Sequence, residues 1–305
     1  MSGYRVARTL AEVEAALAEA GGDLVIFAGG TDLMVRARPR VHKSPALDVA
    51  QVAELRRVAL EDGELVLGAA VTYTDCLVDP LIRRACPLLT QVAERFASPQ
   101  IRNVATLGGN VANASPAGDG LAALWALDAR VEALTPEGRL SRGIEEVVQG
   151  PGRLRLSSGS VLTAFRVAAA VADEGVAFYK LTNRAWPEHP MAIAVASVAA
   201  RIRLDAEGRV ALARLVLGAV APTPVRALAA EAALVGHVPT PARIAEAARA
   251  AAEAARPISD TRASAGYRRQ VLPALALRTI ESALGAARRE GSGWRGTEPF
   301  RGVDR

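Results

Sequence analysis

The chain reads FAGGTDL over residues 27–33, directly after the apolar run 24–26. A second glycine pair lies in TLGGN, residues 106–110, and is followed by Ser115 and Asp119. Glycine has no Cβ, so backbone N–H groups in such segments can turn toward an anion and approach it closely. Two segments of this kind predict one long phosphate-bearing ligand held at two places, and a dinucleotide such as FAD meets that demand.

The composition of the chain limits its class. Its 305 residues suggest about two domains. Half of them are hydrophobic, and the net charge of +5 comes from arginines interleaved with Asp and Glu. That mixture lacks the basic-aromatic pattern of nucleic-acid binding, so it favours a basic face for a protein partner.

Metal chemistry is not expected in this chain. Cys76 and Cys86 are the only cysteines, no CxxC motif occurs, and the three histidines are isolated. These residues predict no metal ligands, no iron–sulfur cluster and a reducing, cytoplasmic location. The apolar stretch 191–200 is too short to span a membrane, and no apolar signal segment begins the sequence.

The first half of the chain alternates strand and helix patterns. A capping-box spacing at Thr9 to Glu12 predicts a helix that ends at Gly21, and Asp-Gly at 62–63 predicts a hairpin. A short helix is expected from Gly120 to Asp128, with its N-terminus toward the second glycine segment. Strands are predicted at 24–27, 47–49, 58–60, 65–67, 131–135, 140–142 and 161–167, and a mostly helical stretch interrupted at its prolines at 74–96.

The second half reads as strands followed by helices. The periodicity predicts strands at 178–181, 191–204 and 210–220, then helices at 224–235, 240–255 and 262–285. The last twenty residues look loose. Mixed elements followed by strands and then helices predict two domains of α+β type.

Five segments together carry a resemblance to a known family. They are AGGTDL at 28–33, ATLGGNVANASP at 105–116, Asp119, YKL at 179–181 and RASAGYRR at 262–269. In this order and spacing, the chain resembles the FAD-binding medium subunit of the molybdenum hydroxylases, the xanthine dehydrogenase and carbon monoxide dehydrogenase family.

The resemblance implies a fold and domain limits. Residues 1–170 should form the two-subdomain FAD-binding fold of vanillyl-alcohol oxidase-like flavoproteins, with subdomains at about 1–55 and 56–170. Residues 171–288 should form a small C-terminal domain of a sheet backed by helices, and 289–305 a flexible tail.

The resemblance also implies an activity and partners. Electrons would pass from a large molybdopterin subunit, through [2Fe–2S] clusters on a small subunit, to FAD on this chain. This chain would then reduce NAD⁺, oxygen, a quinone or another acceptor. Both other cofactors would belong to the partner subunits, and no catalytic residue is expected here. The loops lack a His or Cys tether, so FAD would be bound non-covalently.

The site residues implied by the resemblance begin with the two glycine segments. The first should wrap the FAD pyrophosphate through backbone N–H groups, although a ligand-free tight turn is the alternative. Thr31 and Asp32 are candidates to cap the next helix, and Asp32 is not expected to touch phosphate because both are anionic. The segment residues are Ala28, Gly29, Gly30, Thr31, Asp32 and Leu33 in the first, and Thr106, Gly108, Gly109 and Asn110 in the second.

Further residues have two readings each. Asn110 is alternatively a turn residue, and Ser115 offers a hydroxyl. The Asp119 carboxylate suits sugar hydroxyls or, alternatively, caps the helix at Gly120. Lys180 would stabilise the reduced flavin or lie solvated at a strand end. Phe96 and Leu162 would contact the flavin or belong to the core.

Some features leave the function open. The segment 182–190 is longer than in many relatives and contains Trp186, so the acceptor is undecided. Thr31-Asp32 stands where the carbon monoxide-oxidising branch tends to have His-Ser, and the extra cysteines of benzoyl-CoA-reducing relatives are missing. Two rival functions remain: a stand-alone FAD reductase of the enolpyruvyl-reductase type, and a non-catalytic assembly protein with the same fold.

Overall fold

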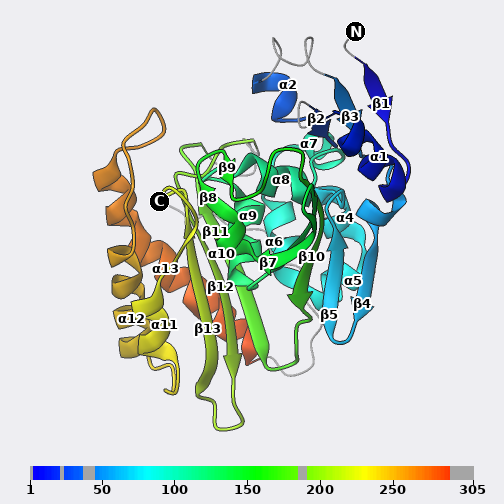
Figure 1. The fold of residues 1–305 in the computed structure, drawn as a ribbon. Coiled ribbons are helices and arrows are strands. Elements are labelled where there is room, and N and C mark those ends of the chain that lie inside the picture. The colour runs from blue at the N-terminus through cyan, green and yellow to red at the C-terminus, as the bar shows by residue number, and fades with distance from the viewer. Residues whose placement is uncertain (1–2, 21–23, 37–44, 185–190, 289–305) are drawn as a thin grey trace.

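A small parallel sheet opens the fold. The computed structural model describes residues 3–20, 24–36, 45–184 and 191–288. In the N-terminal sheet, strand β3 (Ala46–Asp48) lies between β1 (Tyr4–Val6) and β2 (Val25–Phe27). Helices α1 (Leu10–Ala20) and α2 (Leu33–Arg36) flank it, and α2 follows the first glycine segment directly (Figure 1).

An antiparallel sheet of five strands follows. Its spatial order is β4-β5-β10-β6-β7. The β4–β5 hairpin turns at Asp62 and Gly63, which both have positive φ as a two-residue Asp-Gly turn requires. The strands are β4 (Val58–Glu61), β5 (Glu64–Gly68), β6 (Arg130–Thr135), β7 (Gly138–Gly143) and β10 (Val161–Ala168), after the 3-10 helix η1 (Ala53–Arg56).

Short helices follow β5 and β7 in the chain. Proline opens three of them, at Pro80, Pro87 and Pro99, because a first helical residue needs no N–H donor. Thr72 and Asp75 form a capping box at another. The elements are α4 (Tyr73–Val78), α5 (Pro80–Ala85), α6 (Pro87–Glu94), α7 (Pro99–Arg102), α8 (Leu107–Asn113), α9 (Asp119–Ala126) and α10 (Ile144–Val147), with the small pair β8 (Val148–Gly150) and β9 (Arg153–Leu154).

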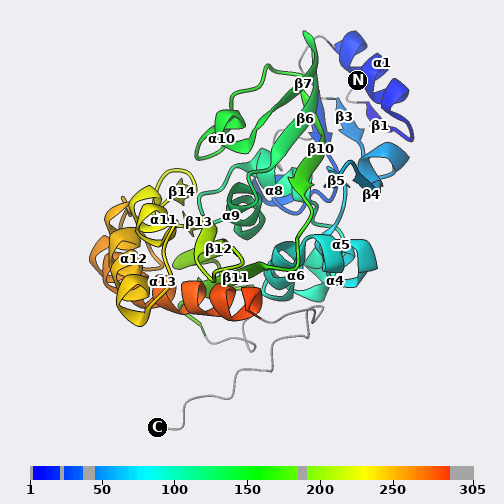
Figure 2. The ribbon, with the colours of Figure 1, turned by 90° about the horizontal axis from the view of Figure 1, so that it is seen from below.

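The C-terminal half is a second antiparallel sheet between two layers of helix. Its order is β11-β12-β13-β14. Helices α11, α12 and α13 cover one face, and α6 and α9 approach the other (Figure 2). The elements are β11 (Glu174–Leu181), β12 (Ala196–Leu204), β13 (Val210–Gly218), β14 (Val225–Arg226), α11 (Leu228–Leu234), α12 (Pro241–Glu253) and α13 (Ala265–Ala287).

The α+β class is confirmed, with differences in detail. Residues 191–195 do not continue the strand expected there, because β11 ends at Leu181, opposite Ala196, and offers no further partner. The helix expected from residue 224 begins at Leu228, after β14. The expectations for the tail and for residues 185–190 lie outside the described residues. No helix in the described ranges could cross a membrane.

Candidate cofactor site

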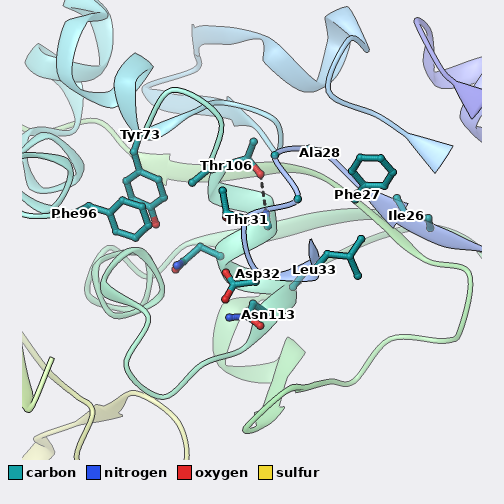
Figure 3. Close-up of a pocket in the computed structure, with 16 residues that line it drawn as sticks. Ile26, Phe27, Ala28, Thr31, Asp32, Leu33, Tyr73, Phe96, Thr106 and Asn113 are labelled. Carbon is teal, nitrogen blue, oxygen red and sulfur yellow. Dashed lines mark hydrogen bonds between the residues drawn. The ribbon is translucent and has the colours of Figure 1, made fainter. Parts of the chain in front are cut away.

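A cavity of about 280 Å³ lies between the two glycine segments. Strand β2 ends at Phe27 and leads directly into its first wall, while α8 forms the opposite wall (Figure 3). The lining residues are Ile26, Phe27, Ala28, Gly29, Gly30, Thr31, Asp32, Leu33, Tyr73, Phe96, Ala105, Thr106, Gly109, Asn110, Ala112 and Asn113. The fold therefore brings together two segments that are far apart in the sequence.

Gly29 and Gly30 shape the first wall for different reasons. A Cβ on Gly29 would lie 1.8 Å from the backbone oxygen of Val104, so only glycine lets this loop reach the segment before α8. Gly30 has a φ of +66°, in the left-handed region that glycine adopts without strain. The loop is thereby fixed from both sides.

The first wall presents backbone hydrogen-bond donors to the cavity. Among the described residues, no acceptor is found for the backbone N–H groups of Gly29, Gly30, Thr31 and Asp32. Unpaired backbone donors that line a cavity are expected to bind a ligand or water. This loop therefore fits the pyrophosphate of a dinucleotide such as FAD.

The second glycine segment differs from the expected loop. It is the first turn of helix α8, capped by Thr106, whose Oγ1 accepts the N–H of Gly109 at 3.0 Å. The N–H groups of Leu107 and Gly108 donate to the carbonyls of Val71 and Ala69. Since these donors are already used, the second wall contributes side chains and small residues rather than a phosphate cradle.

Helical geometry decides which residues of this segment line the cavity. Thr106, Gly109, Asn110 and Asn113 are spaced i, i+3, i+4 and i+7, so they share one face of α8. Gly108 lies on another face, where a Cβ would come within 2.6 Å of the Ala69 carbonyl oxygen. Gly108 thus allows α8 to pack closely and does not line the cavity.

Asn110 joins the cavity wall to the next helix. Its Oδ1 accepts the N–H of Leu121 at 3.0 Å, which ties α9 to α8. The alternative of a left-handed turn residue is wrong, because Asn110 is helical. Ser115 lies in the α8–α9 connection, where its Oγ accepts the N–H of Ala117 at 3.3 Å, outside the lining.

Asp119 and Lys180 form a buried ion pair rather than cavity walls. Their Oδ2 and Nζ atoms lie 2.7 Å apart, and both side chains are 6% exposed. Burial raises the pKa of Asp119 and the ammonium of Lys180 opposes that rise. Gly118, not Asp119, is the N-cap of α9, and Lys180 is not solvated. The second oxygen of Asp119 has no partner within the described residues.

An aromatic stack closes the other end of the cavity. Tyr73 and Phe96 stack with their ring centroids 3.7 Å apart, and Figure 3 shows the pair beside the loop that carries Thr31. Burial raises the pKa of Tyr73 well above its ordinary value. Leu162, predicted alongside Phe96, belongs to the buried core beside the five-stranded sheet and does not line the cavity.

Part of the lining was not predicted from the sequence. Ile26, Phe27 and Asn113 flank predicted segments, and a helical reading of residues 106–113 would have found Asn113. Tyr73 had no local signal, since its place depends on the long-range pairing of its N–H with the carbonyl of Ala105. Five predicted residues lie outside the lining: Gly108, Ser115, Asp119, Leu162 and Lys180.

Two family models match the chain. Residues 1–169 match the FAD binding domain in molybdopterin dehydrogenase, and residues 178–283 match the CO dehydrogenase flavoprotein C-terminal domain. Together the matches extend over both glycine segments and most of the C-terminal half.

Relatives are similar over nearly their whole length. The chain is 33% identical to a putative xanthine dehydrogenase FAD-binding subunit of Escherichia coli K12, over 93% of this chain and 96% of that protein. It is 29% identical to the carbon monoxide dehydrogenase medium chain of Hydrogenophaga pseudoflava, over 93% and 96%.

Solved structures show the same fold. A chain of the carbon monoxide dehydrogenase from Hydrogenophaga pseudoflava aligns with a TM-score of 0.86 and 30% identity, over 93% of this chain and 97% of that one. A chain of quinoline 2-oxidoreductase from Pseudomonas putida 86 aligns with a TM-score of 0.85 and 28% identity, over 94% and 98%.

Proposed function

The chain belongs to the FAD-binding subunits of the molybdenum hydroxylases, and from this premise we propose that it carries electrons from a small [2Fe–2S] subunit to an acceptor such as NAD⁺. A large molybdopterin subunit would hydroxylate the substrate. FAD, when bound, supplies a carrier that accepts and releases one or two electrons. The assembly would be cytoplasmic.

One observation carries the proposal. The cavity between β2 and α8 has, on one wall, backbone donors that have no acceptor among the described residues, and on the other wall polar side chains. Gly29 to Asp32 would hold the pyrophosphate, and Thr106 and Asn113 would meet the sugar hydroxyls. The Tyr73–Phe96 stack would shield one end of the site from water.

The domain limits belong to the same proposal. The first domain would comprise residues 1–170, with the cavity between its subdomains at about 1–55 and 56–170. The second would comprise residues 171–288. The flavin contact implied for Phe96 fits the cavity, which Phe96 lines, whereas the contacts implied for Leu162 and Lys180 would need the flavin ring to extend past that lining.

The match of residues 178–283 to a CO dehydrogenase flavoprotein domain supports an electron-transfer subunit over a stand-alone reductase. The acceptor is open in this proposal. Residues 185–190, in the segment expected near the acceptor, lie outside the described ranges.

Purification of the tagged chain from its native host tests the proposal. We expect oxidised-flavin and iron–sulfur absorption and two co-purifying chains, one with molybdopterin. Adding NAD⁺ to the substrate-reduced complex should restore the oxidised flavin spectrum if NAD⁺ is the acceptor. A yellow monomer that oxidises NADPH without partners would favour the stand-alone reductase, and a colourless chain the assembly protein.

A further inference from the structure

The conspicuous motif RASAGYRR, residues 262–269, does not touch the cofactor cavity. It lies at the start of α13, in the C-terminal half. Its Arg268 is 3% exposed, and burying a guanidinium is costly unless it is paired. The motif therefore keeps the charged guanidinium of Arg268 in the protein interior, although this residue does not line the cavity.

Arg268 bridges two groups. One guanidinium nitrogen donates to the backbone oxygen of Ala219 at 2.6 Å, and another donates to Oδ1 of Asp260 at 2.6 Å. The N–H of Arg262 also donates to that Asp260 oxygen. One side of the guanidinium is thus held by the Asp260 carboxylate, and another side hydrogen-bonds the peptide carbonyl of Ala219.

The residue whose carbonyl Arg268 binds has a strained backbone. Ala219 follows β13 with a φ of +62°, a conformation that costs a residue with a Cβ about 1 kcal/mol. Its N–H donates to the carbonyl of Pro116 at 2.8 Å, and the next carbonyl, of Val220, accepts the N–H of Arg256. This turn therefore links the C-terminal half to the α8–α9 connection.

The α8–α9 connection in turn fixes the cavity wall. Pro116 lies between Ser115 and Gly118, and a Cβ on Gly118 would come within 3.1 Å of the Asn110 Oδ1. That same Oδ1 accepts the N–H of Leu121 and belongs to a side chain in the cavity lining. A shift of Pro116 would consequently move Asn110.

We propose that Arg268 is a positioning residue for the cofactor, which fixes the Asn110 side of the cavity through the peptides of Ala219 and Pro116. The inference rests on the proposed binding of FAD in this cavity and gives the C-terminal motif a role in it. Arg268 touches neither the cavity nor the reacting atoms.

Measuring both FAD affinity and thermal stability distinguishes a positioning role of Arg268 from a purely structural one. The variants are Arg268→Met, which loses both bonds, and Arg268→Lys, which can keep one. The matched control is Arg201→Met, because Arg201 is also buried and paired with a carboxylate, that of Glu174, but lies on β12 opposite Arg214, away from the Ala219 turn. FAD is titrated into each full-length apoprotein by flavin fluorescence, and melting is followed without FAD.

We expect Arg268→Met to weaken FAD binding roughly tenfold and Arg268→Lys to recover part of that loss. Arg201→Met should lower the melting temperature of the apoprotein without changing the FAD dissociation constant. In an Asn110→Ala background, Arg268→Met should weaken FAD binding less than it does in the natural chain, because the route passes through Asn110. The flavin circular-dichroism bands should also differ between Arg268→Met and Arg201→Met.

Equal FAD affinities for the natural chain and the Arg268 variants would overturn the inference while leaving the proposed function intact. The inference also fails if Arg201→Met weakens FAD binding as much as Arg268→Met. A natural chain that takes up no FAD would overturn both the inference and the proposed function. If Arg268→Met does not fold, Arg268→Lys and Asp260→Asn decide by the same titration, each with a predicted loss of affinity.

Discussion

Gly29 and Gly30 show how much one residue can decide at this site. Gly29 is required by proximity, because its Cα faces the backbone of Val104. Gly30 is required by conformation, because its φ is positive while a Cβ would have room, 3.5 Å from Met34 Cγ. The sequence pair therefore encodes a close approach and a turn, and both serve the same cavity wall.

Gly29→Ala should abolish FAD uptake. A methyl group 1.8 Å from the Val104 oxygen must push the loop away from α8, at a cost of about 1–3 kcal/mol or more. Flavin fluorescence titration and urea unfolding of the apoprotein measure the two effects. Gly63→Ala is the control: it meets strain from φ +80° in the β4–β5 hairpin, but no atom within 4 Å, and should leave FAD affinity unchanged. A Gly29→Ala chain that binds FAD normally would contradict the assigned packing.

Asp260 should make stability depend on pH in the acid range. Burial favours its neutral form, but the N–H of Arg262 and the guanidinium of Arg268 outweigh burial and lower the pKa of Asp260 from 3.8 to about 2. A carboxyl group whose pKa is lower in the folded chain than in the unfolded chain stabilises the folded state at pH values above its unfolded pKa. That contribution is lost as pH falls from 3.8 toward 2.

The comparison with Asp260→Asn isolates this effect. Urea unfolding should show the natural chain more stable than the variant at about pH 5, with a smaller difference at about pH 3. Other carboxylates titrate in both chains, so the difference between the chains is the relevant quantity. A difference that stays constant or grows toward acid would show that Asp260 is not held ionised.

At the scale of elements, local signals predicted part of the fold. The Asp-Gly turn predicted the β4–β5 hairpin, and Pro80 and Pro87 predicted interruptions of the helical stretch, where α5 and α6 begin, because both signals act through the backbone of one or two residues. For residues 106–110, by contrast, the local signal led to a wrong prediction. Their glycines suggested a loop, whereas the Thr106 cap and the pairing with Val71 and Ala69 make them helical.

In the candidate site, too, local features could be predicted and long-range contacts could not. The first glycine loop could be predicted because Gly29 and Gly30 carry its geometry themselves. The Asp119–Lys180 pair could not, because it joins α9 to β11 through tertiary packing that no local pattern records. Tyr73 was missed for the same reason. Long-range contacts therefore account for most of what could not be predicted from the sequence.

FAD should protect the N-terminal sheet selectively. Strands β1, β2 and β3 rest on the smallest of the three clusters that the described residues form, so local opening there should be easier than in β12 and β13. If opening of β2 releases FAD, its amides should exchange about a hundredfold more slowly at a cofactor concentration 100 times the dissociation constant. Hydrogen exchange with and without FAD measures this, with β12 as the internal reference. Equal slowing in β2 and β12 would instead indicate global stabilisation.

At the scale of the whole molecule, the two halves share a core. One face of the C-terminal sheet contributes Val176, Phe178, Ala199 and Val216 to the cluster that also holds α6 and α9. The other face packs on α11, α12 and α13. All eight residues of α9 are buried, since this helix lies between α8 and the C-terminal sheet (Figure 2). The two regions matched by the family models are therefore joined by a shared buried core as well as by the chain itself.

A chain cut at about residue 172 should consequently fail to fold and to bind FAD, although it keeps every residue of the cavity lining. Removing β11 and β12 would expose the apolar sides of α6 and α9 and leave Asp119 without Lys180. Urea unfolding followed by circular dichroism, together with FAD titration, tests this. A chain ending at residue 288 is the control for truncation and should bind FAD like the full chain. Cooperative unfolding and normal FAD affinity in the short fragment would show that the first domain is independent and that the shared core is dispensable for the site.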